Sequence, residues 1–285
     1  MNLKLSVSIV TFQEVAYIRQ ALDSVLQQQT EFPFDIIVGD DASTDGTRKV
    51  LQEILQQHPK KIQLLLPDNN HGDSGLSNFM ATLDASKSEY VAFLDGDDYW
   101  TDPDKLQRQV DFLDEHRECA LCCHRVKHLS DDGFIELSVN PATRKEVYDV
   151  GALLMQNFAP KISTVVRRSA IRQLPLWYRT TKIASADWVF NILAGRCGKI
   201  GFIDTPMAVH RKRDNGLSAA YGAEKMLSDK LKAINELRPY FPHHNRALER
   251  AEHLLRWKLR VARFGPVAYQ AVRRLYAIPR TRFRV

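Results

Sequence analysis

Three carboxylates lie within four positions of one another in the sequence FLDGDDYW, residues 93–100. They are Asp95, Asp97 and Asp98. They directly follow residues 90–94, whose length and composition predict a buried strand. Like charges this close repel one another, and burying them is costly unless a positive group compensates. Mg2+ or Mn2+ would compensate, because these hard cations bind one or two carboxylates together with substrate phosphates. The simpler interpretation of the same residues is an acidic turn before the next helix.

A second pair of acids, Asp40 and Asp41, follows another predicted strand at 34–38. The carboxyl ends of parallel strands meet at one edge of a sheet, where open α/β sheets bind their ligands. If both strands belong to one such sheet, one acid group can hold a metal and phosphates. The other group can accept hydrogen bonds from a ribose or base. Turn formation before a helix is the alternative for this pair, because Asp favours such turns.

The elements that must position these acids follow from hydrophobic periodicity. Strands at 5–11, 34–38, 62–66 and 90–94 alternate with helices around 18–26, 50–55, 76–85 and after Asp102-Pro103. This alternation predicts a largely parallel sheet that is covered on both sides. After residue 118 we expect a strand at 119–126, a hairpin at 126–139, a helix at 147–157, a strand at 163–167, a helix at 187–195, short strands at 200–203 and 207–210, and helices from about 221 with breaks at Pro239, Pro242, Gly265-Pro266 and Pro279.

The composition is that of a globular chain. Its 285 residues are 44% hydrophobic, enough for one large domain or for a domain with an appendage. No run of about 18 apolar residues occurs, so no membrane-spanning helix is expected. The first residues lack a cleavable signal and are typical of a strand, which predicts a cytoplasmic protein. Cys119, Cys122, Cys123 and His124 have a zinc-like spacing, but no second cysteine pair follows, so buried free thiols are favoured.

Several functional classes lack their signatures. No Gly-x-Gly-x-x-Gly follows the first strand and no Gly-Lys-Ser/Thr occurs, which argues against a dinucleotide-binding fold and a P-loop NTPase. The absence of Gly-x-Ser-x-Gly argues against a serine hydrolase of that class. No recognised nucleic-acid-binding module is present, so we expect no nucleic-acid partner.

The sequence resembles the family 2 glycosyltransferases, inverting sugar-nucleotide enzymes with the GT-A fold. The resemblance rests on three motifs in order, at 7–14, 38–47 and 93–100, and on two weaker ones, at 186–188 and at His210-Arg211 with Ser218. It covers residues 5–218. It implies an α/β catalytic domain over 1–218, with a mixed, mainly parallel sheet flanked by helices. Residues 1–118 would form the nucleotide-binding half and 119–218 the acceptor-binding half, and 219–285 would be a basic helical extension.

The resemblance implies that the first two motifs hold the nucleotide. Thr11 and Glu14, after the first strand, would border the base and ribose. Asp41 would hydrogen-bond the base or ribose, with Asp40 beside it. The implied donor is a nucleotide-diphosphate sugar, and UDP- or dTDP-sugars are favoured.

The resemblance also implies which residues carry out the chemistry. Asp97 would ligate a divalent metal on the diphosphate, with Asp95 near the ribose and Asp98 sharing the metal. The metal would stabilise the leaving nucleoside diphosphate. Asp187 falls where the family places its general base, which typically contributes about 10²–10⁴-fold. Without the resemblance, Asp187 would be interpreted as a helix-start residue, favoured by the positive end of the helix.

One motif departs from the family pattern. Relatives often carry Tyr-Arg-x-His near the end of the catalytic domain, where this chain has His210-Arg211-Lys212-Arg213. Arg211 matches, and Arg211 and Arg213 would face the diphosphate as fixed cations. A different interpretation makes His210 an additional metal ligand instead, since imidazole can bind Mn2+. The alternative for the whole run is a solvated basic strand end, because charge runs usually lie at the surface.

The basic character of the chain belongs to its C-terminal end. Residues 219–285 hold 15 Lys/Arg and 5 Asp/Glu, so that +10 of charge lies there against −4 for residues 1–218. Within 246–264 an apolar stripe and a face with Arg256, Arg260 and Arg263 predict an amphipathic helix. Such a helix can lie on anionic lipid, which would make the protein peripheral to a membrane. It can equally pack on the catalytic domain with its basic face in water.

We therefore predict a metal-dependent, inverting transfer of a sugar from a nucleotide-diphosphate donor to a hydroxyl of a glycan or lipid-linked saccharide. Two alternatives stay open. A sugar-phosphate nucleotidyltransferase would also use clustered Asp and Mg2+, although the Gly-rich, basic loop expected after its first strand is absent. A non-catalytic binding protein with this fold would show broken acidic motifs, whereas here they are intact.

Overall fold

The computed structural model describes residues 3–138, 141, 145–214, 216–265 and 282–284. Four parallel strands form the centre of its sheet, in the order β3 (Ile62–Leu65), β2 (Phe34–Asp40), β1 (Leu5–Thr11) and β4 (Tyr90–Asp95). These are the four strands expected from the sequence. Their apolar runs, bounded by turn residues, have the length that a buried strand needs.

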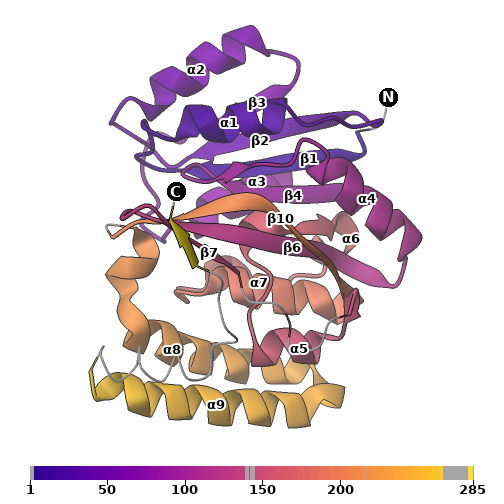
Figure 1. Cartoon of the computed structure of the whole chain (residues 1–285), viewed down its shortest axis with the longest axis vertical. Helices are drawn as coiled ribbons and strands as arrows, with labels where there is room; N and C mark the ends of the chain where they lie inside the picture. Colours follow the sequence, from indigo (N-terminus) through magenta and orange to yellow (C-terminus); the bar gives the residue numbers. More distant parts are fainter. Residues whose placement is uncertain (1–2, 139–140, 142–144, 215, 266–281, 285) are drawn as a thin grey trace.

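The register of the central strands brings the two acid groups together. Thr11 in β1 lies opposite Asp40 in β2, and Val10 lies opposite Asp95 in β4. All three strands run in the same direction, so these residues lie at one edge of the sheet, on the left in Figure 1. The expectation that both acid groups share the carboxyl edge is confirmed.

Two apolar clusters fill the space on the two faces of the sheet. The helices α1 (Ile18–Leu26), α2 (Thr47–Gln57) and α4 (Lys105–Glu115) pack in one cluster with β1 and β2. The helices α3 (Leu76–Ala85), α5 (Val150–Met155) and α7 (Ala186–Ala194) pack in the other. Strand β4 contributes Phe93 to the second cluster and Leu94 to the first, as the period of two along a strand requires.

Beyond β4 the sheet becomes mixed. β9 (Val165–Arg167) pairs antiparallel with β4 and with β6 (Cys119–Ser130), and β6 forms the expected hairpin with β7 (Phe134–Leu137). β10 (Lys199–Lys212) runs parallel to β6 and pairs antiparallel with β5 (Tyr99–Trp100) and β8 (Val147–Tyr148). β11 (Arg282–Arg284) pairs with β7.

Some predicted bounds were wrong. The two short strands expected at 200–203 and 207–210 are one strand, β10, whose register with β6 shifts around Pro206 because proline has no N–H to donate. The helix expected at 147–157 is preceded by β8, and α5 covers only 150–155. The helix expected from Asp102-Pro103 begins at Lys105, since the Asp102 carboxylate accepts the Asp104 amide at 2.9 Å in a turn.

The remaining elements complete the second half of the chain. They are α6 (Arg168–Ile171), α8 (Leu217–Leu237), α9 (Asn245–Arg263) and 3-10 turns at Lys161–Ser163, Leu176–Thr180, Gly195–Cys197, Arg238–Tyr240 and Pro242–His244. The last two turns interrupt the helices at Pro239 and Pro242, as expected. Pro266 and Pro279 lie outside the described residues.

The C-terminal helices pack on the α/β part of the molecule. Leu248, Ala251 and Leu255 of α9 are buried in the same apolar cluster as α7 and β6. The apolar stripe of α9 therefore faces the protein, and α8 and α9 lie together at the bottom of Figure 1. Among the described residues, no helix combines the length and the apolar character that crossing a membrane would require.

Candidate active site

The acid group after β4 is built on a tight turn. The Gly96 amide donates to the Val10 carbonyl at 2.9 Å, and the Asp98 amide donates to the Asp95 carbonyl at 3.1 Å. A β-carbon at Gly96 would lie 2.5 Å from the Thr11 hydroxyl oxygen, so only glycine fits against β1 here. The turn holds Asp95 and Asp97 beside the end of β1, where the sequence placed them.

A cation compensates each of these two acids. Lys161 forms an ion pair with Asp95, and an Arg213 nitrogen lies 2.9 Å from the Asp97 carboxylate. Burial raises the pKa of Asp97 and the charge of Asp95 raises it further, while Arg213 and His210 oppose the rise. The charge density that the sequence indicated is therefore real, and the protein's own cations balance it.

Asp98 has a different environment from its neighbours. Its side chain is fully buried, and one carboxylate oxygen accepts the Arg211 amide at 2.7 Å. Burial raises its pKa well above the ordinary value, with Asp97 and Asp95 adding to the rise. Asp98 thus attaches the end of β10 to the acid turn, and its share in metal binding stays a prediction.

Arg211 contacts several protein groups. Its guanidinium lies 4.9 Å from the ring centre of Tyr17 and 4.7 Å from that of Tyr99. It donates to the Asp97 carbonyl and, at 2.6 Å, to Gln20. Its predicted contact with the diphosphate stays a prediction, and Arg213 is the residue that reaches the Asp97 carboxylate.

The acids after β2 are also buried and partnered. Asp40 accepts Arg48 at 2.7 Å and the Ser43 amide at 3.0 Å. Asp41 accepts the side chains of Asn70 at 2.9 Å and His71 at 2.8 Å. Each carboxylate oxygen can accept more than one bond, so these partners leave acceptor capacity for a nucleotide.

Gln13 joins the first two motifs to each other. Its side-chain carbonyl accepts the backbone amides of Thr44 and Asp45 at 2.9 and 3.0 Å, and its backbone amide donates to the Ser43 hydroxyl. Gln13 and Ala42 both have positive φ, 57° and 62°, which is uncommon for residues with a β-carbon. Such conformations persist only where the surroundings impose them, and they cluster at functional sites.

Glu14 is the last residue of the first motif, and its carboxylate reaches Arg213, which directly follows β10. One carboxylate oxygen is 2.6 Å from Arg213, and the other is buried without a partner among the described residues. Burial raises the pKa of Glu14 to about 7, with Asp97 adding to the rise and Arg213 opposing it. The Thr11 hydroxyl is likewise buried and unpartnered among these residues. Both groups have unused hydrogen-bonding capacity at the expected nucleotide position.

His210 is influenced by the charges of both the acid group and the predicted base. Burial lowers its pKa, while Asp95, Asp97 and Asp187 all oppose the lowering, so their three charges act on the same ring. Its Nδ1 lies 3.0 Å from Nδ1 of His128 on β6. Asp187 lies in the first turn of α7 and is half-buried, without an ion pair to any described residue. Trp188 next to it is buried in the core and donates to the Leu153 carbonyl at 2.9 Å.

Four residues of the site were not found from the sequence. Lys161 pairs with Asp95, Arg48 with Asp40, and Asn70 and His71 with Asp41. The segments that carry Lys161, Asn70 and His71 contain no recognisable motif. These three side chains lie next to the acids only because the folded sheet brings distant segments of the chain together.

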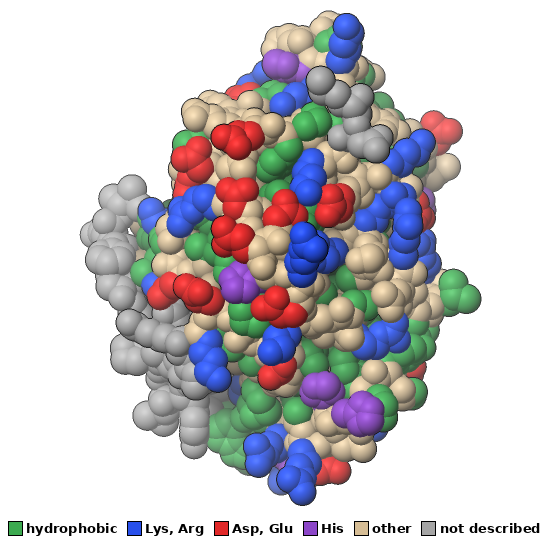
Figure 2. Space-filling view, turned by 90° about the vertical axis from the view of Figure 1, so that its right-hand side faces the viewer, with side chains coloured by type: hydrophobic (Ala, Val, Ile, Leu, Met, Phe, Trp, Pro, Cys, Tyr) green, Lys and Arg blue, Asp and Glu red, His purple; other side chains and the backbone are tan. Residues whose placement is uncertain are grey.

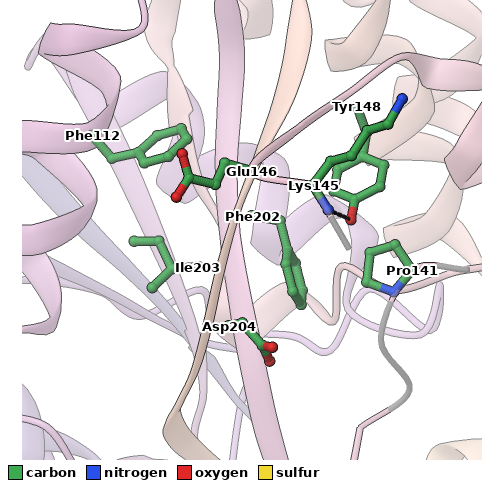
Figure 3. A pocket seen from close by; sticks show the side chains of 8 residues that line it. All are labelled: Phe112, Pro141, Lys145, Glu146, Tyr148, Phe202, Ile203 and Asp204. Atoms are coloured by element: carbon green, nitrogen blue, oxygen red, sulfur yellow. Dashed lines mark hydrogen bonds between the residues drawn. The ribbon is translucent and has the colours of Figure 1, made fainter. Parts of the chain in front are cut away.

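One cavity of the molecule lies away from these residues. It has a volume of about 400 Å³ and is lined by Phe112, Pro141, Tyr148 and Phe202 together with charged side chains, as Figure 3 shows. It borders the first half of β10, whereas the acids lie at the strand's far end. The face at the amino ends of the strands, drawn in Figure 2, carries interspersed acidic and basic side chains over its upper half.

The donor set fits a metal that arrives with phosphates. No group of three or more His, Cys, Asp or Glu side chains is placed to hold a metal within the described part of the chain. Asp95 and Asp97 supply two carboxylates at the sheet edge. Mg2+ in nucleotide sites typically takes only one or two carboxylates and completes its shell with phosphate oxygens and water.

Comparison with known proteins places the chain in a family. Residues 6–175 match the model of glycosyl transferase family 2. An uncharacterised protein of Mycobacterium tuberculosis is 35% identical over 75% of this chain and 60% of its own length. TuaG of Bacillus subtilis, named for teichuronic acid biosynthesis, is 35% identical over 46% of this chain and 51% of its own length. The chain thus spans about 60% or less of these relatives.

Solved structures share the fold. TarS of Staphylococcus aureus in complex with UDP-GlcNAc matches with a TM-score of 0.64 at 20% identity, over 83% of this chain and 67% of that one. A mannosyltransferase of Pyrobaculum calidifontis with GDP-Man and Mn2+ matches with a TM-score of 0.65 at 17% identity, over 98% of this chain and 77% of that one.

Proposed function

The chain belongs to glycosyl transferase family 2 and has the GT-A fold, and from that premise we propose a metal-dependent, inverting transfer of a sugar. The donor would be a nucleotide-diphosphate sugar and the acceptor a hydroxyl of a glycan or lipid-linked saccharide. One observation carries the proposal. Asp40 and Asp95 end the two parallel strands on either side of β1, so both acid groups lie at the sheet edge where open α/β folds bind their ligands.

The residues of the first two motifs would bind the nucleotide. The unpartnered oxygens of Thr11 and Glu14 are available to the ribose or base, and Asp41 keeps acceptor capacity beside them. A UDP- or dTDP-sugar is favoured. TarS is solved with UDP-GlcNAc, and TuaG is named for a glycan, which supports this donor and acceptor class without choosing the sugar.

Asp97, with Asp95 beside it and Asp98 behind it, would hold the divalent metal. That metal, Mg2+ or Mn2+, would supply positive charge to the departing nucleoside diphosphate. Arg213 and Arg211 add positive charge on the same side. The site therefore favours a leaving group that gains negative charge.

Asp187 would take the proton of the attacking hydroxyl. Its carboxylate has no competing ion pair among the described residues, so it is available as an acceptor. Attack from the side opposite the leaving group inverts the anomeric centre. The reaction then needs no covalent nucleophile.

The test is a transfer assay that follows nucleoside diphosphate release and the anomeric configuration of the product by NMR. Asp187→Asn should lower kcat by about 10²–10⁴-fold with little change in donor KM, because it removes a base and no donor contact. Asp149→Asn, which changes the same residue type just before α5, is the matched control and should be unaffected. Turnover of a sugar 1-phosphate with a nucleoside triphosphate, or full activity of Asp187→Asn, would overturn the proposal.

A further inference from the structure

Arg213 bridges two carboxylates that come from different motifs. A single guanidinium nitrogen lies 2.6 Å from Glu14 and 2.9 Å from Asp97, and its side chain is only 17% exposed. The ring of Tyr17 lies beside the guanidinium, with its centre 5.1 Å away. A cation thus occupies the carboxylate on which the proposed function places the metal.

We infer that Arg213 is a displaceable counter-ion of the donor site. It pairs with Asp97 and Glu14 while the site is empty, and it moves to the donor's phosphates as the metal reaches Asp97. The inference rests on the proposed function. It assigns Arg213 a role in donor binding, and it implies that metal and nucleotide enter the site together.

Charge balance is the first argument for this exchange. Lys161 and Arg213 already neutralise Asp95 and Asp97, so a divalent cation entering alone would meet two resident cations. When the metal enters on a diphosphate, the phosphates offset its charge and also offer Arg213 a new partner. Arginine suits the exchange, because its planar guanidinium matches both carboxylate and phosphate oxygens.

Ligand count is the second argument. Within the described residues no three metal-ligating side chains converge, so the protein alone offers a metal few bonds. A diphosphate adds the missing oxygens. A metal that binds alone must therefore displace Arg213 while forming few coordination bonds. A metal that binds together with the nucleotide gains the phosphate oxygens as ligands, and Arg213 gains the phosphates as a new partner.

Titration of Mn2+ into the full chain, followed by electron paramagnetic resonance, tests the exchange with and without saturating UDP, dTDP or GDP. The wild type should bind Mn2+ weakly alone and more tightly with its nucleotide, by a coupling of about 5–150-fold. Arg213→Gln should tighten Mn2+ binding in the absence of nucleotide. It should weaken nucleotide binding in the presence of Mn2+, so that the coupling factor falls towards one. By linkage, calorimetry of the nucleotide must give the same coupling factor.

Two further variants keep the result interpretable. Arg179→Gln removes an arginine that pairs with Asp84 on α3, and it should leave both constants unchanged. Arg213→Lys keeps the positive charge but loses the planar guanidinium, so its coupling factor should lie between those of the wild type and Arg213→Gln. If Arg213→Gln leaves Mn2+ binding unchanged or weakens it in the nucleotide-free titration, the inference is wrong, although the transferase assignment survives. If no nucleotide binds the wild type, the proposed function itself fails.

Discussion

At the scale of single residues, the proposed chemistry depends on buried carboxylates, and the cations and amides beside them make that burial possible. Asp97 and Asp98 are neighbours in sequence, yet one meets Arg213 and the other a backbone amide. The sequence predicts that carboxylates cluster here, because three of them follow an apolar strand. It does not predict which cation meets which acid. Lys161 approaches Asp95 only because β9 pairs with β4, a contact between distant segments.

Lys105 makes a residue-scale prediction about pH. It is fully buried, its nitrogen lies 3.9 Å from the centre of the Trp100 ring, and burial lowers its pKa to about 7. In the unfolded chain its pKa returns to about 10.4, so between these values the unfolded state holds more protons and the free energy of unfolding rises with pH. Lys105→Met removes this dependence.

Urea unfolding at pH 7 and pH 9.5 checks the prediction. Relative to Lys105→Met, the wild type should gain stability as the pH rises through this window, on the order of a few kcal/mol at most. A difference between the two proteins that stays constant with pH would show that the ammonium group remains charged in the folded state.

At the scale of elements, the sheet register places the site. The parallel strands were predicted from their apolar runs, and with them the shared edge of Asp40 and Asp95. The course of β10 was not predicted, because Pro206 interrupts its pattern and suggests two strands. That single long strand carries His210 and Arg211 to the acids, and Arg213 directly follows its end, which explains why their partners could not be read from the sequence.

Gly96→Ala tests the contact between β1 and the acid turn. The added methyl group would meet the Thr11 side chain at 2.5–2.7 Å, which forces the turn away from β1. Overpacking of this kind typically costs about 1–3 kcal/mol in the free energy of unfolding, and nucleotide affinity should fall with it. Gly151→Ala in α5 meets only Ala247 at 3.6 Å and should be neutral or stabilising. Thermal unfolding with and without nucleotide measures both, and equal effects would refute the steric account.

At the scale of the whole molecule, α9 combines a buried stripe with a basic outer face. Arg246, Arg250 and Arg260 are exposed and pair with no carboxylate of the described residues. Other arginines of this region are balanced, since Arg256 pairs with Glu252 and Arg263 with Glu224. We propose that the unbalanced face lies on an anionic membrane surface, where each cation contributes roughly 1 kcal/mol.

Co-sedimentation with phosphatidylglycerol vesicles tests this face. Replacing Arg246, Arg250 and Arg260 by Glu together should weaken binding by at least about 100-fold, and wild-type binding should fall with added salt. Replacing the exposed Lys49, Lys60 and Arg117 by Glu makes the same change of charge elsewhere and should have a smaller effect. Equal losses in the two triple variants would mean that only net charge matters, and no binding by the wild type would exclude a membrane role for α9.

The measurement that bears most directly on the central claim is a calorimetric titration of UDP-, dTDP- and GDP-sugars, each with and without Mn2+. We predict that one nucleotide class binds the wild type in a metal-dependent way and that Asp97→Ala loses the metal dependence. Nucleotide binding that is equally strong without Mn2+ and in Asp97→Ala, or no binding of any donor, would contradict the assignment of this sheet edge as a metal-dependent donor site.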